Sequence, residues 1–236
     1  MNNPEEMSKG MTPNLPLWSY QLQQNSKLAL RTRKDLDVHL ITRSLKDEEF
    51  KQELLANPKV VVEQELRTKL PEELEINVIE ETEDTLYMVL PCNPYEGMSE
   101  EEMKASLGMT YEDVAQWVLE QQKNTLLDDA SSVMMLSRVW KDEAFKRDLL
   151  SHTKATLAKE LGSKIPVCVD IKVVSESPNI LYLVLPKFFE KYTSKELYED
   201  KALSETTLEA VAGTYQELVI GSTHHNPNTL INNCTR

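Results

Sequence analysis

The chain has 236 residues, of which 40% are hydrophobic, so it can bury a substantial core. Its 39 acidic residues outnumber 26 basic ones and give a net charge of -13, which argues against binding to nucleic acid or to an anionic membrane surface. No apolar run approaches the roughly 20 residues that span a bilayer, and the N-terminus lacks the order of a secretory signal, so we expect a cytoplasmic protein without membrane insertion.

An internal repeat dominates the chain. Residues 43–91 align with residues 138–186 without a gap, at an offset of 95, and 21 of the 49 aligned positions are identical. We interpret this as a duplication. Each copy is therefore expected to form the same unit.

Two helices are predicted at the start of each copy. Asp47 and Asp142 are suitable N-caps for the first helix. Its apolar positions predict one buried stripe in each copy, formed by Phe50, Leu54 and Leu55 and by Phe145, Leu149 and Leu150. Asn57 and Pro58 predict the start of the second helix in copy one, and Gly162 predicts a left-handed C-cap in copy two.

A β-hairpin is predicted at the end of each copy. Apolar and polar residues alternate after Pro71 and after Pro166, and the segments TLYMVL and ILYLVL follow a polar turn of about four residues. The fold class predicted is therefore α+β, a tandem unit of two helices followed by a β-hairpin, with extra lead-in helices and disordered termini. The acidic stretch of Glu80, Glu81, Glu83 and Asp84 is interpreted as a solvated hairpin tip rather than as paired catalytic carboxylates.

Composition shifts suggest six segments. Lead-in helices are expected before each copy, within 17–41 and from Tyr111 to Trp140, and Trp140 itself is expected to pack in a core with Phe50 and Phe145. The predicted division is a disordered N-terminus (1–16), repeat one (17–92), an acidic linker (93–110), repeat two (111–187), a further segment (188–214) and a C-terminal segment (215–236).

Cysteine and histidine spacing argues against a metal site. Cys92, Cys168 and Cys234 are far apart in sequence, and none of them has a close cysteine neighbour. His224 and His225 lack a close third ligand, and His39 and His152 are interpreted as ordinary surface or capping residues. We predict neither a metal nor another cofactor.

Copy two carries a run of residues that resembles the nitrile hydratase-like leader peptide family. These residues are Trp140, Asp142, Phe145, Leu149, Leu150, Glu160, Leu161, Gly162, Pro166 and the strand LYLVLP, which includes Tyr182 and Pro186. Copy one carries a further subset in LLANP, LPEELE and EETEDTLYMVLP. The resemblance covers somewhat under half of the chain.

The resemblance implies a bacterial precursor of a ribosomally made, post-translationally modified peptide of the proteusin type, whose leader recruits modifying enzymes. Such leaders resemble the α subunit of nitrile hydratase, but that enzyme holds its metal with a tight cluster of cysteines. This chain has no such cluster, so we expect no catalytic nitrile hydration and no enzyme activity.

The stretch LSETTLEAVAG resembles the end of a leader that a double-glycine peptidase cuts. Leu203, Ser204, Leu208 and Val211 match the recognition positions, and Ser204 would cap a short helix that ends at Gly213. Thr214 stands where a second glycine is usual. The matching register places the cut between Thr214 and Tyr215, with the bond after Gly213 as the alternative.

The segment from Tyr215 to Arg236 is then a candidate core peptide. It contains one acid and one base, so the net negative charge lies entirely in the preceding residues. Hydroxyls for dehydration, a thiol that could add to a dehydrated residue, and asparagines for modification are supplied by Ser222, Thr223, Thr229, Thr235, Cys234, Asn226, Asn228, Asn232 and Asn233.

Two functions from different classes remain open. As a precursor, the chain would meet peptide-modifying enzymes and a leader peptidase or transporter, and the cleaved product could be exported. As a stand-alone adaptor or chaperone for those enzymes, it would have an inert tail; an enzyme of the nitrile hydratase class is a distant third. We also consider self-association of the two repeats.

Overall fold

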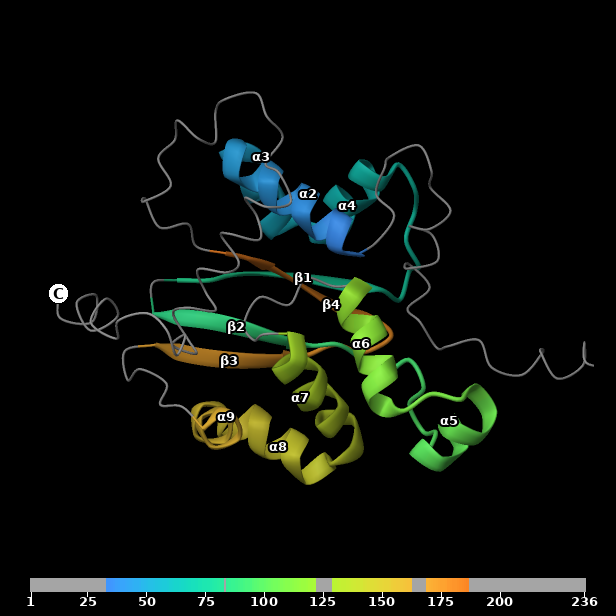
Figure 1. Ribbon diagram of the computed structural model, residues 1–236. Helices are drawn as coiled ribbons and strands as arrows, with labels where there is room; N and C mark the ends of the chain where they lie inside the picture. The colour runs from blue at the N-terminus through green and yellow to red at the C-terminus, as the bar shows by residue number, and fades with distance from the viewer. Residues whose placement is uncertain (1–32, 83, 122–128, 163–168, 187–236) are drawn as a thin grey trace, which may run out of the picture.

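A computed structural model describes residues 33–82, 84–121, 129–162 and 169–186, which form a mixture of helices and strands (Figure 1). The α+β class is confirmed. The expectations for both termini and for Pro166, Cys168 and Glu83 lie outside the described residues. The elements, in chain order, are α2 Arg33–Lys46, α3 Glu48–Ala56, α4 Pro58–Leu66, β1 Glu75–Glu80, β2 Thr85–Leu90, α5 Glu100–Leu107, α6 Tyr111–Gln121, α7 Asp129–Lys141, α8 Glu143–Ser151, α9 Thr153–Leu161, β3 Asp170–Ser175 and β4 Ile180–Leu185.

The predicted N-caps of α3 and α8 are confirmed. Asp47 accepts a hydrogen bond from the backbone N–H of Phe50 at 3.0 Å, and Asp142 accepts from Ala144 and Phe145 at 2.9 Å. Each bond satisfies a donor that the first turn of a helix leaves unpaired.

The second helix of each copy begins and ends as the sequence indicates. Pro58 occupies the first turn of α4, although the Asn57 side chain makes no capping hydrogen bond. Gly162 ends α9 in the left-handed region with φ 63°. The corresponding residue in copy one is Arg67, which takes φ 52°.

The predicted hairpins are wrong, because the strands of one copy pair with those of the other. β1 pairs in parallel with β4, and β2 pairs in parallel with β3, so each two-stranded sheet contains one strand from each copy. The polar turn between β1 and β2 is present, with Thr82 N–H bonded to Thr85 O at 3.0 Å, but the strands then take different partners. Alternating sequence specifies which face of a strand is buried and not which strand lies beside it.

The exchange is symmetric. Glu75 lies opposite Ile180, and Thr85 lies opposite Asp170. The repeat aligns Glu75 with Asp170 and Thr85 with Ile180, so the same two repeat positions meet in both sheets. The chain therefore has the internal symmetry of a dimer in which two subunits exchange their last strand.

Helices cover one face of each sheet (Figure 1). A first core joins α2, α3 and α4 to Leu181, Leu183 and Leu185 of β4. A second joins α7, α8 and α9 to Leu86, Met88 and Leu90 of β2. In both cores, the helices of one copy bury alternate side chains of a strand that belongs to the other copy.

The predicted linker 93–110 also contributes to a core. Ser99 and Glu102 form a reciprocal capping box at the start of α5, whose Met103 is fully buried beside Tyr111 and Val114 of α6. Lys141 joins this region to α7 through ion pairs with Glu100 and Glu112. The segment is therefore a folded part of a core and also the connection between the two copies.

Two side chains differ from the sequence prediction. Leu150 is 40% exposed rather than part of the buried stripe, because it lies about 100° around α8 from the fully buried Leu149. Glu81 is buried at 5% exposure rather than solvated at a hairpin tip, whereas Glu80 and Asp84 are exposed. The buried Glu81 carboxylate accepts a hydrogen bond from the backbone N–H of Tyr87 in β2.

Candidate functional site

The candidate cleavage and modification residues, Leu203 to Arg236, all lie outside the described residues. The leader motif is described, from Trp140 to Leu150 and at Tyr182 and Pro186. The structure therefore shows what the motif does within the fold.

The first part of the motif builds the second core. Phe145 and Leu149 are buried, and Trp140 is half-buried between this core and that of α5 to α7. The Trp140 Nε1–H donates to the carbonyl of Pro91 at 3.2 Å, which ties α7 to the end of β2. These residues hold the copies together and do not converge on a cleft.

Both copies repeat one arginine arrangement. Arg138 lies with its Cζ 4.1 Å from the centroid of the Phe145 ring and forms an ion pair with Glu160. In copy one, Arg43 lies 4.1 Å from the Phe50 ring and pairs with Glu65. The arginines thus tie the last turn of one helix to the two helices that follow.

His39 extends the arrangement in copy one only. Its Nε2 lies 2.6 Å from the Glu65 carboxylate. Burial raises the pKa of Glu65, but hydrogen bonds from His39 and Arg43 outweigh it and hold the pKa below its ordinary value. The corresponding residue in copy two is Met134, which is 69% exposed.

The last part of the motif lies in the other half of the fold. Tyr182 belongs to β4, which pairs with β1 of copy one, and Pro186 directly follows that strand. The strand exchange therefore separates Tyr182 and Pro186 from Trp140 and Phe145. The motif is split between the helices α7 and α8 of one half and the strand β4 of the other, and is not a single binding site.

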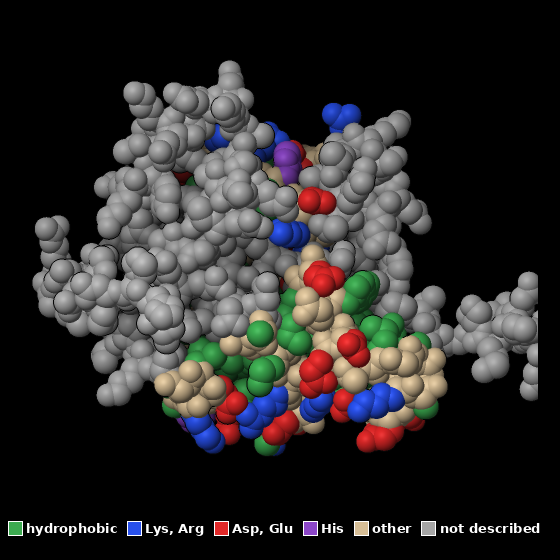
Figure 2. Space-filling model, in the orientation of Figure 1, with side chains coloured by type: hydrophobic (Ala, Val, Ile, Leu, Met, Phe, Trp, Pro, Cys, Tyr) green, Lys and Arg blue, Asp and Glu red, His purple; other side chains and the backbone are tan. Residues whose placement is uncertain are grey.

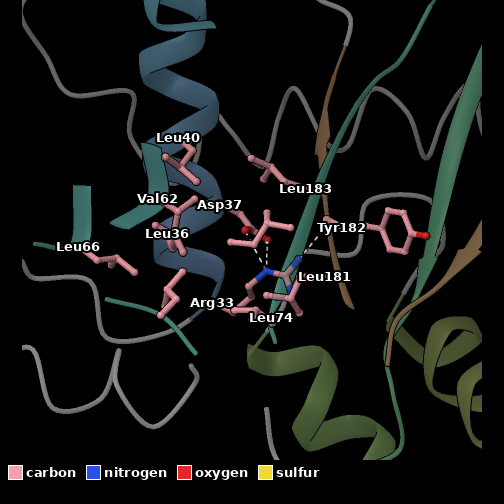
Figure 3. Close-up of a pocket in the computed structure, with 12 residues that line it drawn as sticks. Arg33, Leu36, Asp37, Leu40, Val62, Leu66, Leu74, Leu181, Tyr182 and Leu183 are labelled. Atoms are coloured by element: carbon pink, nitrogen blue, oxygen red, sulfur yellow. Dashed lines mark hydrogen bonds and ion pairs between the residues drawn. The ribbon is translucent and has the colours of Figure 1, made fainter. Parts of the chain in front are cut away.

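A buried charge cluster anchors the exchanged strand β4 (Figure 3). The Arg33 guanidinium donates to the Asp37 carboxylate at 3.0 Å, to the Glu176 carboxylate at 3.1 Å and to the backbone carbonyl of Tyr182. Burial lowers the pKa of Arg33, but Asp37 and Glu176 more than compensate and raise it overall, so Arg33 stays charged.

This charge cluster was not found by the sequence analysis. Arg33 and Asp37 precede the aligned repeat, and a charged pair spaced four residues apart is ordinarily a solvated helix pair. The available signal was Glu176, which aligns with Glu81 and is acidic in both copies within an otherwise apolar region.

Glu81 and Glu176 play equivalent roles at the edges of the sheets. The Glu176 carboxylate accepts the backbone N–H of Tyr182 at 3.0 Å, and the Glu81 carboxylate accepts that of Tyr87 at 3.0 Å. Each glutamate thereby occupies a backbone donor on the outer edge of β4 or β2.

The cavity drawn in Figure 3 lies between α2, α4 and the first sheet. Its volume is about 20 Å³ and its lining is mainly leucine, with Arg33 and Asp37 at one side. A volume of this size holds one water molecule, so the cavity is a packing defect rather than a ligand site.

Cys92 follows Pro91 at the end of β2. Burial, followed by the nearby Glu176 and Glu96, raises the pKa of the Cys92 thiol to about 12. The thiolate is the reactive form of cysteine, so this side chain is inert near neutral pH. Over the described ranges, no group of three or more His, Cys, Asp and Glu side chains is arranged to hold a metal, and no helix is long and apolar enough to cross a membrane.

The face shown in Figure 2 mixes apolar and charged side chains over α5 to α9. Met134 and Leu150 are the large apolar side chains exposed on α7 and α8, and Val60 is 49% exposed on α4. Single exposed apolar residues are common on protein surfaces and do not define a site.

Comparison with known proteins gives a sequence match over part of the chain. Polytheonamide B of Bacterium symbiont subsp. Theonella swinhoei (strain pTSMAC1) is 34% identical over 68 residues, which make up 27% of this chain and 47% of that relative. Together with the motif from Trp140 to Pro186, this decides the resemblance. The chain resembles a nitrile hydratase-like proteusin leader. The match spans somewhat less than half of the relative's length, and no family model matches this leader-like chain.

Among solved structures, the leader-like chain is similar to two double mutants of the Fe-type nitrile hydratase from Comamonas testosteroni Ni1. One superposes with a TM-score of 0.39 and 18% identity, over 92% of this chain and 77% of that one. The other superposes with a TM-score of 0.43 and 17% identity, over 92% of this chain and 82% of that one. At these scores the likeness does not establish a common fold.

Proposed function

We propose that the chain is the precursor of a ribosomally made modified peptide, in which residues 1–214 are the leader and residues 215–236 the core peptide. The observation that carries this proposal is the 34% identity over 68 residues to Polytheonamide B, which fits a proteusin precursor. The leader is not an enzyme in this proposal, and the chemistry is done in trans.

The described fold supports a recruiting role. Its motif residues are used for packing and capping, as Phe145 and Asp142 illustrate, so the folded part offers a rigid scaffold. A scaffold that binds a modifying enzyme raises the effective concentration of an attached tail at the active site of that enzyme.

The proposed modification sites are the hydroxyls and the thiol of the tail. Dehydration of Ser222 or Thr223 removes water and leaves an alkene, to which the Cys234 thiol adds to give a thioether. The asparagines Asn226, Asn228, Asn232 and Asn233 are proposed sites of a separate modification. The cut is proposed between Thr214 and Tyr215.

The test is the intact and fragment mass of the full chain produced with the enzymes encoded beside it. Losses of water confined to residues after Thr214 support the precursor. An unmodified tail on a chain that still binds those enzymes contradicts it and favours the stand-alone adaptor. A Cys234→Ala variant is the matched control, because it keeps every hydroxyl of the tail, adds none, and removes the thiol that thioether formation needs.

The cleavage step has its own prediction. Thr214→Gly restores two consecutive glycines, which a narrow peptidase channel accepts more readily than a β-branched residue. We expect cleavage by a double-glycine peptidase to be about tenfold faster, or roughly 1.4 kcal/mol in the barrier. The rate is measured from the mass of the released tail, and an unchanged rate would argue against this register.

A further inference from the structure

The two strands of each sheet differ at their outer edges. On β4, Ile180 N–H donates to Ser177 O at 3.2 Å, and Tyr182 is hydrogen bonded to Glu176 and Arg33. On β2, Thr85 N–H donates to the Thr82 hydroxyl at 3.1 Å, and Tyr87 is bonded to Glu81. The first half of the outer edge of β2 and of β4 is thus occupied by groups of the preceding turn and, on β4, also by Arg33 of α2.

β1 and β3 carry no such closure within the part of the chain that the structure describes. Glu75 N–H donates to Asn179 O and Glu81 N–H to Leu185 O, so odd-numbered residues of β1 bond to β4. The backbone of the even-numbered Ile76 and Val78 therefore faces outward. By the same alternation, Ile171 and Val173 face outward on β3.

β1 is the more accessible of the two open edges. None of its six residues is buried, whereas Ile171 of β3 is only 2% exposed. β1 also has an acidic residue at each end: the exposed Glu75 has no ion pair within the described residues, whereas Glu80 pairs with Lys51 of α3. The corresponding residues of β3 are Asp170 and Ser175, with the exposed Lys172 between them.

These charges disfavour a second copy of the chain as the occupant. Parallel pairing of two β1 strands in register would bring the two Glu75 side chains together, and antiparallel pairing would offer Glu75 no basic partner other than a Lys51 that already pairs with Glu80. Like charges directly across a strand pair are destabilising, whereas opposite charges stabilise it. An added strand with a basic residue opposite Glu75 therefore fits this edge best.

We infer that the outer edge of β1 binds an extended, basic segment of a partner protein by strand addition. The segment forms backbone hydrogen bonds with Ile76 and Val78, and a cation at one of its ends pairs with Glu75. Taking this partner to be a modifying enzyme rests on the proposed function; the edge itself is defined by the hydrogen bonds described above.

The first test uses the full chain and the blocked peptide Lys-Val-Thr-Val-Thr-Lys as the probe, with amide hydrogen exchange measured residue by residue. At saturating peptide we expect exchange at Ile76 and Val78 to slow by about tenfold or more, and exchange at Ile171 and Val173 to change little. The same peptide with glutamate in place of lysine should give no protection.

Three results would overturn the inference. These are an absence of protection at β1, equal protection at β3, and protection of β1 that rises with protein concentration in the absence of peptide. The third result would assign the edge to a second copy of the chain.

Matched variants come from the repeat itself. Val78→Pro removes an outward N–H from β1 and should abolish peptide protection, while Val173→Pro makes the same change on β3 and should preserve it. Glu75→Lys should weaken binding of the basic peptide, and Asp170→Lys should not. The exposed Glu75 and Asp170 keep the second pair informative if a proline variant is unstable.

The two proposals fail separately. If wild-type tail is modified in the presence of the enzymes and the Val78→Pro tail is modified equally, the strand-addition site is wrong and the precursor function stands. If the wild-type tail is never modified although the peptide protects β1, the precursor function is wrong and the edge remains a binding site for another basic partner.

Discussion

The residue that ends the second helix has the same backbone conformation in both copies but a different free-energy cost. Arg67 and Gly162 both adopt a left-handed conformation, with φ 52° and 63°. A residue with a side chain costs roughly 1–2 kcal/mol more than glycine in this conformation. Part of the advantage of glycine is offset, because glycine loses more conformational freedom on folding. Copy one therefore carries local strain that copy two avoids.

Arg67→Gly should stabilise the protein by about 0.5–1 kcal/mol. Gly162→Ala should destabilise it by a similar amount, because no heavy atom lies within 4 Å of an added Cβ and only the backbone conformation is affected. Urea unfolding of the two variants measures both changes. A loss of stability in Arg67→Gly would show that the arginine side chain has a role beyond the cap.

Cys92 should make the free energy of unfolding depend on pH in a direction that can be stated in advance. Its folded pKa is about 12, above its usual value of 9.0, so the protonated thiol is favoured in the folded state. The resulting stabilisation is complete below pH 9 and is lost as the pH rises from 9 towards 12. Cys92→Ala should therefore lose less stability than wild type between pH 8 and pH 10. Urea unfolding at both values tests this, and parallel losses would contradict it.

At this scale the sequence predicted what is local. Asp47, Asp142 and Gly162 could be assigned because a cap depends on a few adjacent residues. The burial of Glu81 could not, because it depends on a backbone N–H six residues away that becomes available only once β2 has left its expected partner.

At the scale of the elements, the exchange of strands could not be predicted from the local sequence pattern. The segments of β2 and β4 were correctly predicted as strands, but alternation and a short polar turn are equally compatible with a hairpin. The choice is made by distant partners, including the Arg33 cluster that holds the turn before β4.

A designed disulfide separates the two pairings. Asn77 and Tyr182 lie directly opposite each other in the first sheet, so Asn77→Cys with Tyr182→Cys should cross-link on mild oxidation. An antiparallel hairpin with a four-residue turn would instead place Asn77 opposite Met88, and that cysteine pair should remain reduced. Peptide mass mapping distinguishes both pairs from the native cysteines, and the reverse outcome would restore the hairpin.

At the scale of the whole molecule, we expect the described part of the chain to unfold as a single cooperative unit because of this topology. Each sheet contains a strand of each copy, and each helical group covers one such sheet, so neither copy can complete a core alone. The duplication was readable from the sequence at an offset of 95, but its consequence for assembly was not, because the repeat specifies identical units and not how they interlock.

Cutting the chain between the copies should therefore leave them together. Gly97 is exposed after β2 and has no heavy atom close to an added side chain, so a protease site can be inserted there. After cleavage the two fragments should elute as one species under native conditions and separate in denaturant. Separation under native conditions would show that the exchanged strands are not required to hold the halves together.

The strand exchange also sets the order of events during synthesis. The paired positions are 105 residues apart in the first sheet and 85 in the second, so both sheets wait for the second copy. Long-range pairings of this kind fold slowly, because the chain pays the entropy of closing a large loop before any contact compensates. Until then, copy one holds β1 and β2 without their final partners, and a transient hairpin between them is the nearest alternative. We therefore expect a slow, late folding step that no independent folding of the first repeat can bypass.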